Sequence, residues 1–204
     1  MSNNSEKKPR HLIEALSTFF LCLSQYVPVA GPWCGLMIFP LVFYVFGFFW
    51  SYPEFREQQL HIFLFEPRLM FGRVVALIGL LIFLAAFVQL LKARRKGLIT
   101  GGLYSVVRHP QYFGVIILTL GLTIMSIHWS GWNTNVALTW LIAVFGYILL
   151  ASYEEYCLLK KYGKEYAEYK QRVPFIFPIS LSKIPDPLLA TLIALIITFL
   201  LTLV

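Results

Sequence analysis

Long apolar runs constrain the fold of this chain of 204 residues more than any other feature. A helix needs about 20 mostly apolar residues to cross the hydrocarbon core of a bilayer. Runs of this kind lie at about 33–50, 69–91, 110–128, 134–153 and 188–204. Hydrophobic residues make up 58% of the chain and charged residues only 13%, which excludes a soluble domain. The sequence therefore predicts an all-α, polytopic transmembrane bundle with at least five spans.

The segment 12–27 allows two interpretations. Its apolar residues recur at helical spacing, but Glu14 and several other polar residues interrupt them. This pattern fits either an interfacial helix or a sixth span that packs against its neighbours. The residues before it lack the charge pattern, short apolar run and cleavage site of a secretory signal peptide, and are expected to form a short tail. The predicted bundle thus has five to six spans.

The basic residues predict the topology. The loop 92–108 and the segment 160–172 are rich in lysine and arginine, and they flank the helical hairpin 110–153. The two segments therefore lie on one side of the membrane, which is the cytoplasm by the positive-inside rule. The net charge of +7 follows from this clustering, and the aromatic and basic interleaving of a nucleic-acid binder is missing from the sequence. The three cysteines, Cys22, Cys34 and Cys157, have neither metal-ligand spacing nor a disulfide pattern.

The stretch Gly102 to Gly114, GLYSVVRHPQYFG, is the motif around which the second half of the chain is organised. Proline disfavours helix for the residue before it, so His109 should close a loop and Pro110 should open a helix. The first turn of such a helix directs unpaired N–H groups and a positive dipole end at the loop. With Arg108 and His109 at the same point, the loop is a candidate site for a carboxylate or phosphate. The alternative is that both side chains anchor the helix to lipid headgroups.

Two adjacent carboxylates, Glu154 and Glu155, stand where the second helix of the hairpin leaves the hydrocarbon. Charged residues at this depth are unfavourable against lipid, so at least one should face the protein interior. Neighbouring helical residues point about 100° apart, so one can bind a ligand while the other orients Arg108. The alternative is a helix-end charge cluster paired with nearby lysines.

A stripe of aromatic rings, Tyr162, Tyr166 and Tyr169, follows the two carboxylates at helical spacing. Such a stripe is usually a packing surface, but it also suits a cationic ligand. A ligand that carries a carboxylate, a cation and an aromatic ring would find a complement for each group among these motifs. S-adenosylmethionine is one such molecule.

The motifs GLITGGLYSVVRHPQYFG and EEYCLLKKYGKEYAEYKQRVP, separated by a hairpin, resemble the isoprenylcysteine carboxyl methyltransferase family. That family belongs to a wider group that includes phospholipid methyltransferases. The resemblance covers roughly residues 69–178. It implies an S-adenosylmethionine pocket at the cytosolic edge, built by the C-terminal half and partly closed by the segment around Arg172-Val173-Pro174. We therefore expect a tail with membrane helices at 1–68, a methyltransferase core at 69–178 and a last transmembrane helix at 179–204.

The resemblance also implies the residues of the site. Arg108 and Glu155 are the predicted catalytic residues. Arg108 fits the family's Arg-His-Pro triplet, and, on chemical grounds alone, Glu155 or Glu154 can take a proton from an amine acceptor if partial burial raises its pKa. No metal ligand is implied. The implied cofactor contacts come from Gln89, Lys96, Gly97, Leu98, Ile99, Tyr104, His109, Pro110, Gln111, Tyr112 and Glu154.

These inferences predict an integral membrane enzyme that transfers a methyl group from S-adenosylmethionine to a lipophilic or lipidated acceptor, leaving S-adenosylhomocysteine. The acceptor stays open, because prenylcysteine methyltransferases carry an arginine where this chain has Leu150. A prenylcysteine-like carboxylate and an aminolipid are both candidates. The alternatives are an NADPH-dependent enzyme like the sterol reductases and a non-catalytic membrane protein. Membrane lipids are expected neighbours, and neither a nucleic acid nor an obligate protein partner is inferred.

Overall fold

The structure, a computed structural model, describes residues 36–52, 57–93, 97–130, 134–181 and 183–203. A division of the chain falls between Leu36 and Met37, and every helix described below belongs to the unit from Met37 to Val204. The segment 12–27, Lys96, Cys22 and Cys34 lie outside the described residues.

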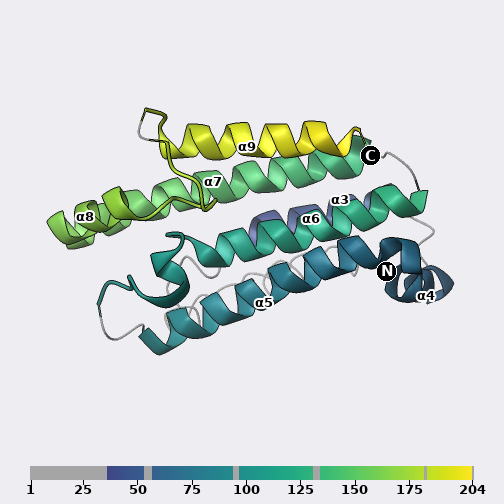
Figure 1. Ribbon diagram of the computed structural model, residues 1–204, viewed down its shortest axis with the longest axis horizontal. Coiled ribbons are helices and arrows are strands. Elements are labelled where there is room, and N and C mark those ends of the chain that lie inside the picture. Colours follow the sequence, from purple (N-terminus) through teal and green to yellow (C-terminus); the bar gives the residue numbers. More distant parts are fainter. Residues whose placement is uncertain (1–35, 53–56, 94–96, 131–133, 182, 204) are drawn as a thin grey trace, which may run out of the picture. The chain divides into compact units, whose positions relative to one another are not determined.

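The described residues form helices and no strand, as the sequence predicts. In chain order the elements are α3 (Ile38–Ser51), α4 (Glu57–Phe65), η2 (Pro67–Leu69), α5 (Met70–Ala93), η3 (Gly102–Ser105), α6 (Pro110–Ser130), α7 (Thr134–Tyr162), α8 (Lys164–Arg172) and α9 (Asp186–Leu201) (Figure 1).

Three helical stretches are long and apolar enough to cross a membrane: Pro67–Ala93, Pro110–Trp129 and Thr134–Tyr162. Three of the predicted spans are therefore confirmed by length and composition. The predicted spans at 33–50 and 188–204 coincide with the shorter apolar helices α3, of 14 residues, and α9, of 16 residues. The predicted helix start at Pro110 is confirmed, and Gly163, with a positive φ of 53°, separates α7 from α8.

Helices α5 and α6 lie side by side because glycines let their backbones approach closely (Figure 1). Gly79 of α5 faces Gly114 of α6, and two helical turns away Gly72 faces Gly121. A methyl group added at Gly79 would lie 2.2 Å from the backbone nitrogen of Leu118. Small residues at such crossings are typical of helices that associate within lipid. This contact fixes both ends of the loop that carries the Arg-His-Pro motif.

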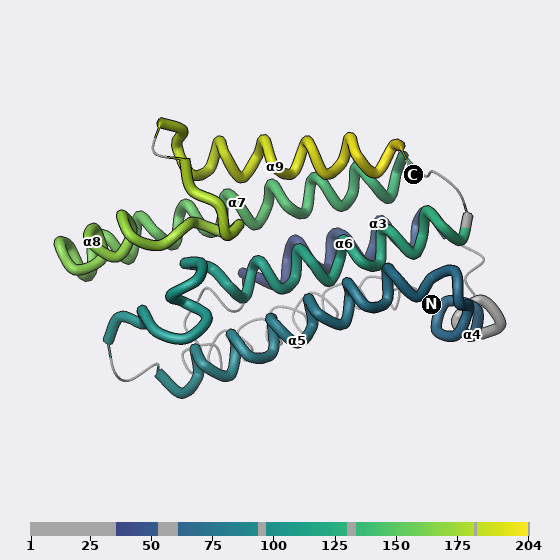
Figure 2. The backbone as a smooth tube through the Cα atoms, viewed as in Figure 1, coloured from purple at the N-terminus to yellow at the C-terminus, as the bar shows by residue number. Residues whose placement is uncertain are grey.

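Helix α7 packs against α3 and against α9. Buried hydrogen bonds join α3 to α6 and join α7 to the residue before α3. The Tyr44 hydroxyl donates to the carbonyl oxygen of Thr119 at 3.1 Å, and the Tyr147 hydroxyl donates to that of Met37 at 3.0 Å. After α8 the residues 173–181 lead back toward the start of α9 (Figure 2). That return path brings the last helix to the Arg-His-Pro loop.

Candidate active site

Gln89, at the end of α5, holds the start of the loop. Its side-chain amide donates to the carbonyl oxygen of Gly101 at 2.5 Å and accepts from the backbone N–H of Leu103 at 3.1 Å. Gly102 has a positive φ of 62°, and a Cβ there would lie 2.2 Å from Gln89 Nε2. The loop therefore needs glycine at this position for its backbone conformation and for the approach of Gln89.

Tyr104 links the loop to α6 and α8. Its hydroxyl donates to Gln111 Oε1 at 3.2 Å, and its carbonyl oxygen accepts from the Tyr169 hydroxyl at 2.6 Å. Tyr166 and Tyr169 are both buried, and burial raises the pKa of each phenol, which keeps the hydroxyls protonated at neutral pH. These two members of the predicted tyrosine stripe pack against the site, with ring centroids 5.9 Å apart.

The Arg-His-Pro loop docks on the predicted closing stretch through its backbone. The N–H of Arg108 donates to the carbonyl oxygens of Pro174 at 2.9 Å and Phe175 at 3.1 Å. The N–H of His109 donates to the same oxygen of Phe175 at 3.2 Å. The segment around Arg172-Val173-Pro174 therefore lies against the loop, as the resemblance implies.

The side chain of Arg108 is enclosed by protein, with an exposed fraction of 1%. Its Nε lies 2.9 Å from Glu155 Oε1, and Nη2 pairs with the carboxylate of Asp186 in the first turn of α9. Nη1 donates to the carbonyl oxygen of Lys170 at 3.1 Å. The guanidinium also lies over the ring of Phe175, 5.4 Å from its centroid. This burial excludes the alternative in which Arg108 anchors α6 to lipid headgroups.

His109 lies between the two glutamates. Its Nδ1 is 3.4 Å from Glu154 Oε2, and its Nε2 is 3.5 Å from Glu155 Oε1. The imidazole stacks on Tyr112 at 5.4 Å and meets Phe175 edge-on. Burial alone would lower the pKa of His109, but the two carboxylates raise it above its ordinary value. A protonated His109 therefore fits this position.

The two glutamates have different environments. Glu155 is buried, and its Oε2 accepts from Lys170 Nζ at 2.7 Å, so it is held by cations on both oxygens. Glu154 keeps 14% of its side chain exposed and accepts from the Tyr112 hydroxyl at 3.0 Å. Glu155 thus orients Arg108, while Glu154 is the carboxylate nearer to solvent.

With His109 protonated, the cluster is balanced in charge. Three cations, from Arg108, His109 and Lys170, face the carboxylates of Glu154, Glu155 and Asp186. Mutual neutralisation allows Arg108, His109 and Glu155 to be buried next to three partly exposed charges.

The other predicted contacts are divided between this cluster and its surroundings. Pro110, Gln111 and Tyr112 are buried in the first turn of α6, next to the cluster. Gly97, Leu98 and Ile99 lie in the stretch before η3, and the structure does not bring them into the hydrogen-bonded cluster formed by the described residues. Lys96 is outside the described residues.

Sequence reasoning missed Asp186 and Lys170, although both contact the cluster directly. Lys170 looks like one of many cytosolic lysines. Asp186 did carry a signal, because it is the only aspartate in the chain and stands between two prolines just before an apolar helix. An acid at that position can cap a helix or pair with a buried cation, and it does the latter here.

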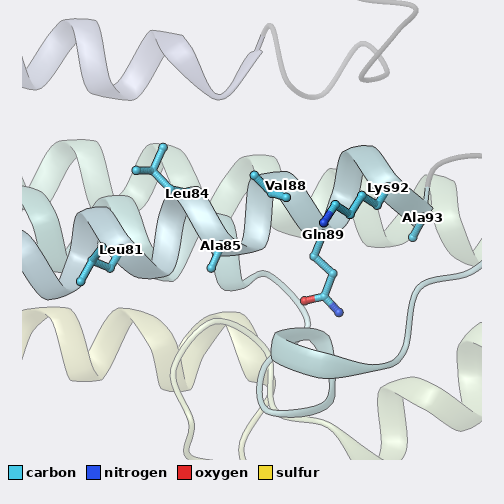
Figure 3. Close-up of a pocket in the computed structure, with 7 residues that line it drawn as sticks. All are labelled: Leu81, Leu84, Ala85, Val88, Gln89, Lys92 and Ala93. Carbon is cyan, nitrogen blue, oxygen red and sulfur yellow. The ribbon is translucent and has the colours of Figure 1, made fainter.

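A cavity of about 660 Å³ that is open on one side runs along α5 and meets the site at Gln89 (Figure 3). Its walls are mostly apolar, and Gln89 points from α5 toward the η3 loop at its polar end. It is lined by Leu81, Leu84, Ala85, Val88, Gln89, Lys92 and Ala93.

Comparisons with known proteins identify relatives over the same region. Residues 68–165 match the family model described as phospholipid methyltransferase. The chain is 34% identical over 93 residues to protein-S-isoprenylcysteine O-methyltransferase B of Arabidopsis thaliana. The aligned region covers 44% of this chain and 45% of the relative. The chain is 31% identical over 121 residues to form A of that plant, covering 52% and 59%. The human protein-S-isoprenylcysteine O-methyltransferase is 32% identical over 92 residues, covering 45% and 31%.

The chain thus spans about half the length of the two plant relatives, 45% and 59%. No solved structure gives a significant match. The comparisons confirm the assignment made from the sequence motifs: the chain resembles the isoprenylcysteine carboxyl methyltransferase family, and its residues 68–165 match the wider phospholipid methyltransferase group.

Proposed function

We propose that the chain is an integral membrane methyltransferase that uses S-adenosylmethionine and acts on a lipophilic acceptor. The names of the relatives make an isoprenylcysteine the leading acceptor. The observation that carries the proposal is the meeting of Glu154, His109 and Tyr112 at the Arg-His-Pro loop, inside the region that matches the family.

The domain plan is part of the proposal. Residues 69–178 form the methyltransferase core, 1–68 the tail and first membrane helices, and 179–204 the last membrane helix. We propose that α3 and α9 also cross the membrane, which gives five spans, or six if segment 12–27 crosses. The site then faces the cytoplasm, an orientation supported by the lysines at 160, 161 and 164, which lie beyond the carboxylates on the same helix and on α8.

The side chains present fit a cationic cofactor. Glu154 offers a partly exposed carboxylate, and its partner Tyr112 has a buried ring that packs against Tyr147 with centroids 5.4 Å apart. A sulfonium or ammonium group is attracted by such a carboxylate. When bound, S-adenosylmethionine supplies an electrophilic methyl group. The residues proposed to hold it are Gln89, Lys96, Gly97, Leu98, Ile99, Tyr104, His109, Pro110, Gln111, Tyr112 and Glu154.

Arg108 and Glu155 are proposed to act through their neighbours. Both side chains are buried and paired with each other, so they position His109 and Glu154 rather than meet the acceptor. Methyl transfer by in-line displacement depends mainly on proximity and alignment, which such a rigid support provides. A carboxylate acceptor needs no base. An amine acceptor must lose a proton, and Glu154 is the carboxylate placed to receive it.

The cavity along α5 is proposed to receive the apolar part of the acceptor. Its apolar walls suit a prenyl or acyl chain, and Gln89 connects it to the loop. Lys92 contributes a cation to its lining. That cation can pair with an acceptor carboxylate, the role that the family's arginine would have at the position of Leu150. This observation favours the carboxylate acceptor over the aminolipid.

The test is a methyl-transfer assay with the purified full-length protein and S-adenosylmethionine labelled in its methyl group. A farnesylated cysteine derivative and phosphatidylethanolamine serve as the two acceptors. Transfer to the first should give a methyl ester, which releases labelled methanol in alkali, whereas a methylated amine is stable to alkali. Alkali-stable label on the lipid alone would replace the proposed acceptor with an aminolipid. Failure to label either acceptor would contradict the enzymatic assignment.

A further inference from the structure

A polar cavity lies at the other end of α6 from the Arg-His-Pro loop. Its volume is about 360 Å³, and it is lined by Ile62, Glu66, Arg68, Leu69, His128 and Trp129. His128 is 18 residues along α6 from Pro110, which corresponds to about 27 Å at 1.5 Å per residue. The cavity is therefore far from the candidate active site and shares no residue with it.

A second cavity, with apolar walls and a volume of about 370 Å³, adjoins the first at His128. It lies between the start of α5, the second half of α6 and the end of α9. Its lining consists of Phe71, Leu120, Ile124, Ile127, His128, Ile197, Leu200 and Leu201. An apolar cavity next to a polar one, at the end of membrane-spanning helices, has the form of a site for a lipid chain and its headgroup.

Two opposite charges in the polar cavity are available to a ligand. Arg68 has an exposed side-chain fraction of 87% and Glu66 one of 41%. Their closest charged atoms are 4.0 Å apart, which is too long for a charge-assisted hydrogen bond. Arg73 donates to the carbonyl oxygens of Leu64 and Glu66, the latter at 2.6 Å, and so holds the turn that carries both charges.

His128 and Trp129 complete the polar cavity. Nδ1 of His128 lies 2.9 Å from the carbonyl oxygen of Ile124, and a carbonyl can only accept, so Nδ1 carries the proton. In the neutral ring Nε2 is then an acceptor. Trp129 packs against the rings of Tyr52 and Phe63, at 5.1 and 6.2 Å, and is the residue type expected at the headgroup level of a membrane.

We propose that the two cavities together bind one aminophospholipid molecule of the phosphatidylethanolamine class. Its phosphate pairs with Arg68, its ammonium donates to Glu66 and to Nε2 of His128, and one acyl chain occupies the apolar cavity. A choline headgroup has no N–H to donate, and the negative charge of an anionic headgroup is opposed by Glu66. The charge pattern therefore selects the ethanolamine headgroup.

The test is native mass spectrometry of the full-length protein, freed of lipid in detergent and then incubated with phosphatidylethanolamine, phosphatidylcholine or phosphatidylglycerol of matched chains. One phosphatidylethanolamine should bind at a concentration at which the other two do not. Glu66→Gln should lower its affinity about tenfold, as expected for one charge-assisted hydrogen bond, and should reduce the preference over phosphatidylcholine by the same factor. Arg68→Gln should weaken all three lipids.

Lys183→Gln, which removes an exposed cation elsewhere in the chain, is the matched control and should bind like the wild type. An unchanged melting temperature in each variant establishes that the fold is intact. Equal binding of the three lipids, preference for phosphatidylglycerol, or a Glu66→Gln variant indistinguishable from Lys183→Gln would each overturn the proposal. Because no residue of the candidate active site is involved, these results are independent of the methyltransferase assay.

Discussion

Replacing Asp186 with asparagine tests whether α9 supports the candidate active site. The substitution keeps the size of the side chain and removes the charge that faces the buried guanidinium of Arg108. Removing one partner of a fully buried ion pair costs about 3–5 kcal/mol. Arg108 keeps Glu155, and Asp186 is 24% exposed, so the loss should be smaller, about 2 kcal/mol, as for a hydrogen bond to a charged group.

The effect should be visible as a change in melting temperature. For a protein of this size each 1 kcal/mol shifts the melting temperature by about 2–4 °C, so Asp186→Asn should melt about 4–8 °C lower. Tryptophan fluorescence of the detergent-purified protein during heating measures this directly. S-adenosylhomocysteine should also bind more weakly, because Arg108 loses one of the contacts that fix the loop. Asp186→Glu, which keeps the charge, should retain most of both properties. Unchanged melting and unchanged binding in Asp186→Asn would refute the supporting role of α9.

Three further perturbations test other parts of the structure. Gly79→Ala should lower the melting temperature, because the added methyl group would meet the α6 backbone. This loss should outweigh the preference of helices for alanine over glycine, about 1 kcal/mol. Gly101→Ala is the control, since a methyl group there would face open space and should leave the melting temperature unchanged. The pKa of His109 is raised, so its charge stabilises the fold fully below its ordinary pKa of about 6.5, and the melting temperature should fall as the pH rises above that value. His109→Gln should remove this fall. A variant with the same pH profile of melting temperature as the wild type would contradict the role given to the His109 charge. Tyr112→Phe loses the bond to Glu154 and should weaken S-adenosylhomocysteine binding about tenfold in calorimetry; wild-type affinity would exclude that contact from the cofactor site.

Local sequence signals predicted the elements that carry the site. Pro110 opens α6 because its ring is compatible only with the first turn of a helix. The basic residues at 160–172, predicted to lie on one side of the membrane, fall at the end of α7 and in α8. The unfavourable energy of an unpaired carboxylate near the membrane interior predicted that at least one of Glu154 and Glu155 faces the protein, and Glu155 is the one that contacts Arg108.

What the sequence could not provide were contacts between distant segments. Asp186 reaches Arg108 across 78 positions, and nothing in the residues around it indicates that partner. The apolar run that contains α9 predicts a membrane helix and carries no information about where its first turn lies. The pairing of Gly79 with Gly114 and of Gly72 with Gly121 is likewise visible only once α5 and α6 are packed together.

Calorimetric titration of the detergent-purified protein with S-adenosylhomocysteine, beside NADPH, tests the central claim most directly. We predict that S-adenosylhomocysteine binds at one site per chain, that NADPH does not bind, and that Glu154→Gln weakens the binding. Binding of NADPH alone would contradict the account and favour a reductase related to the sterol reductases. Binding of neither would contradict the assignment of a cofactor site to the Arg-His-Pro loop.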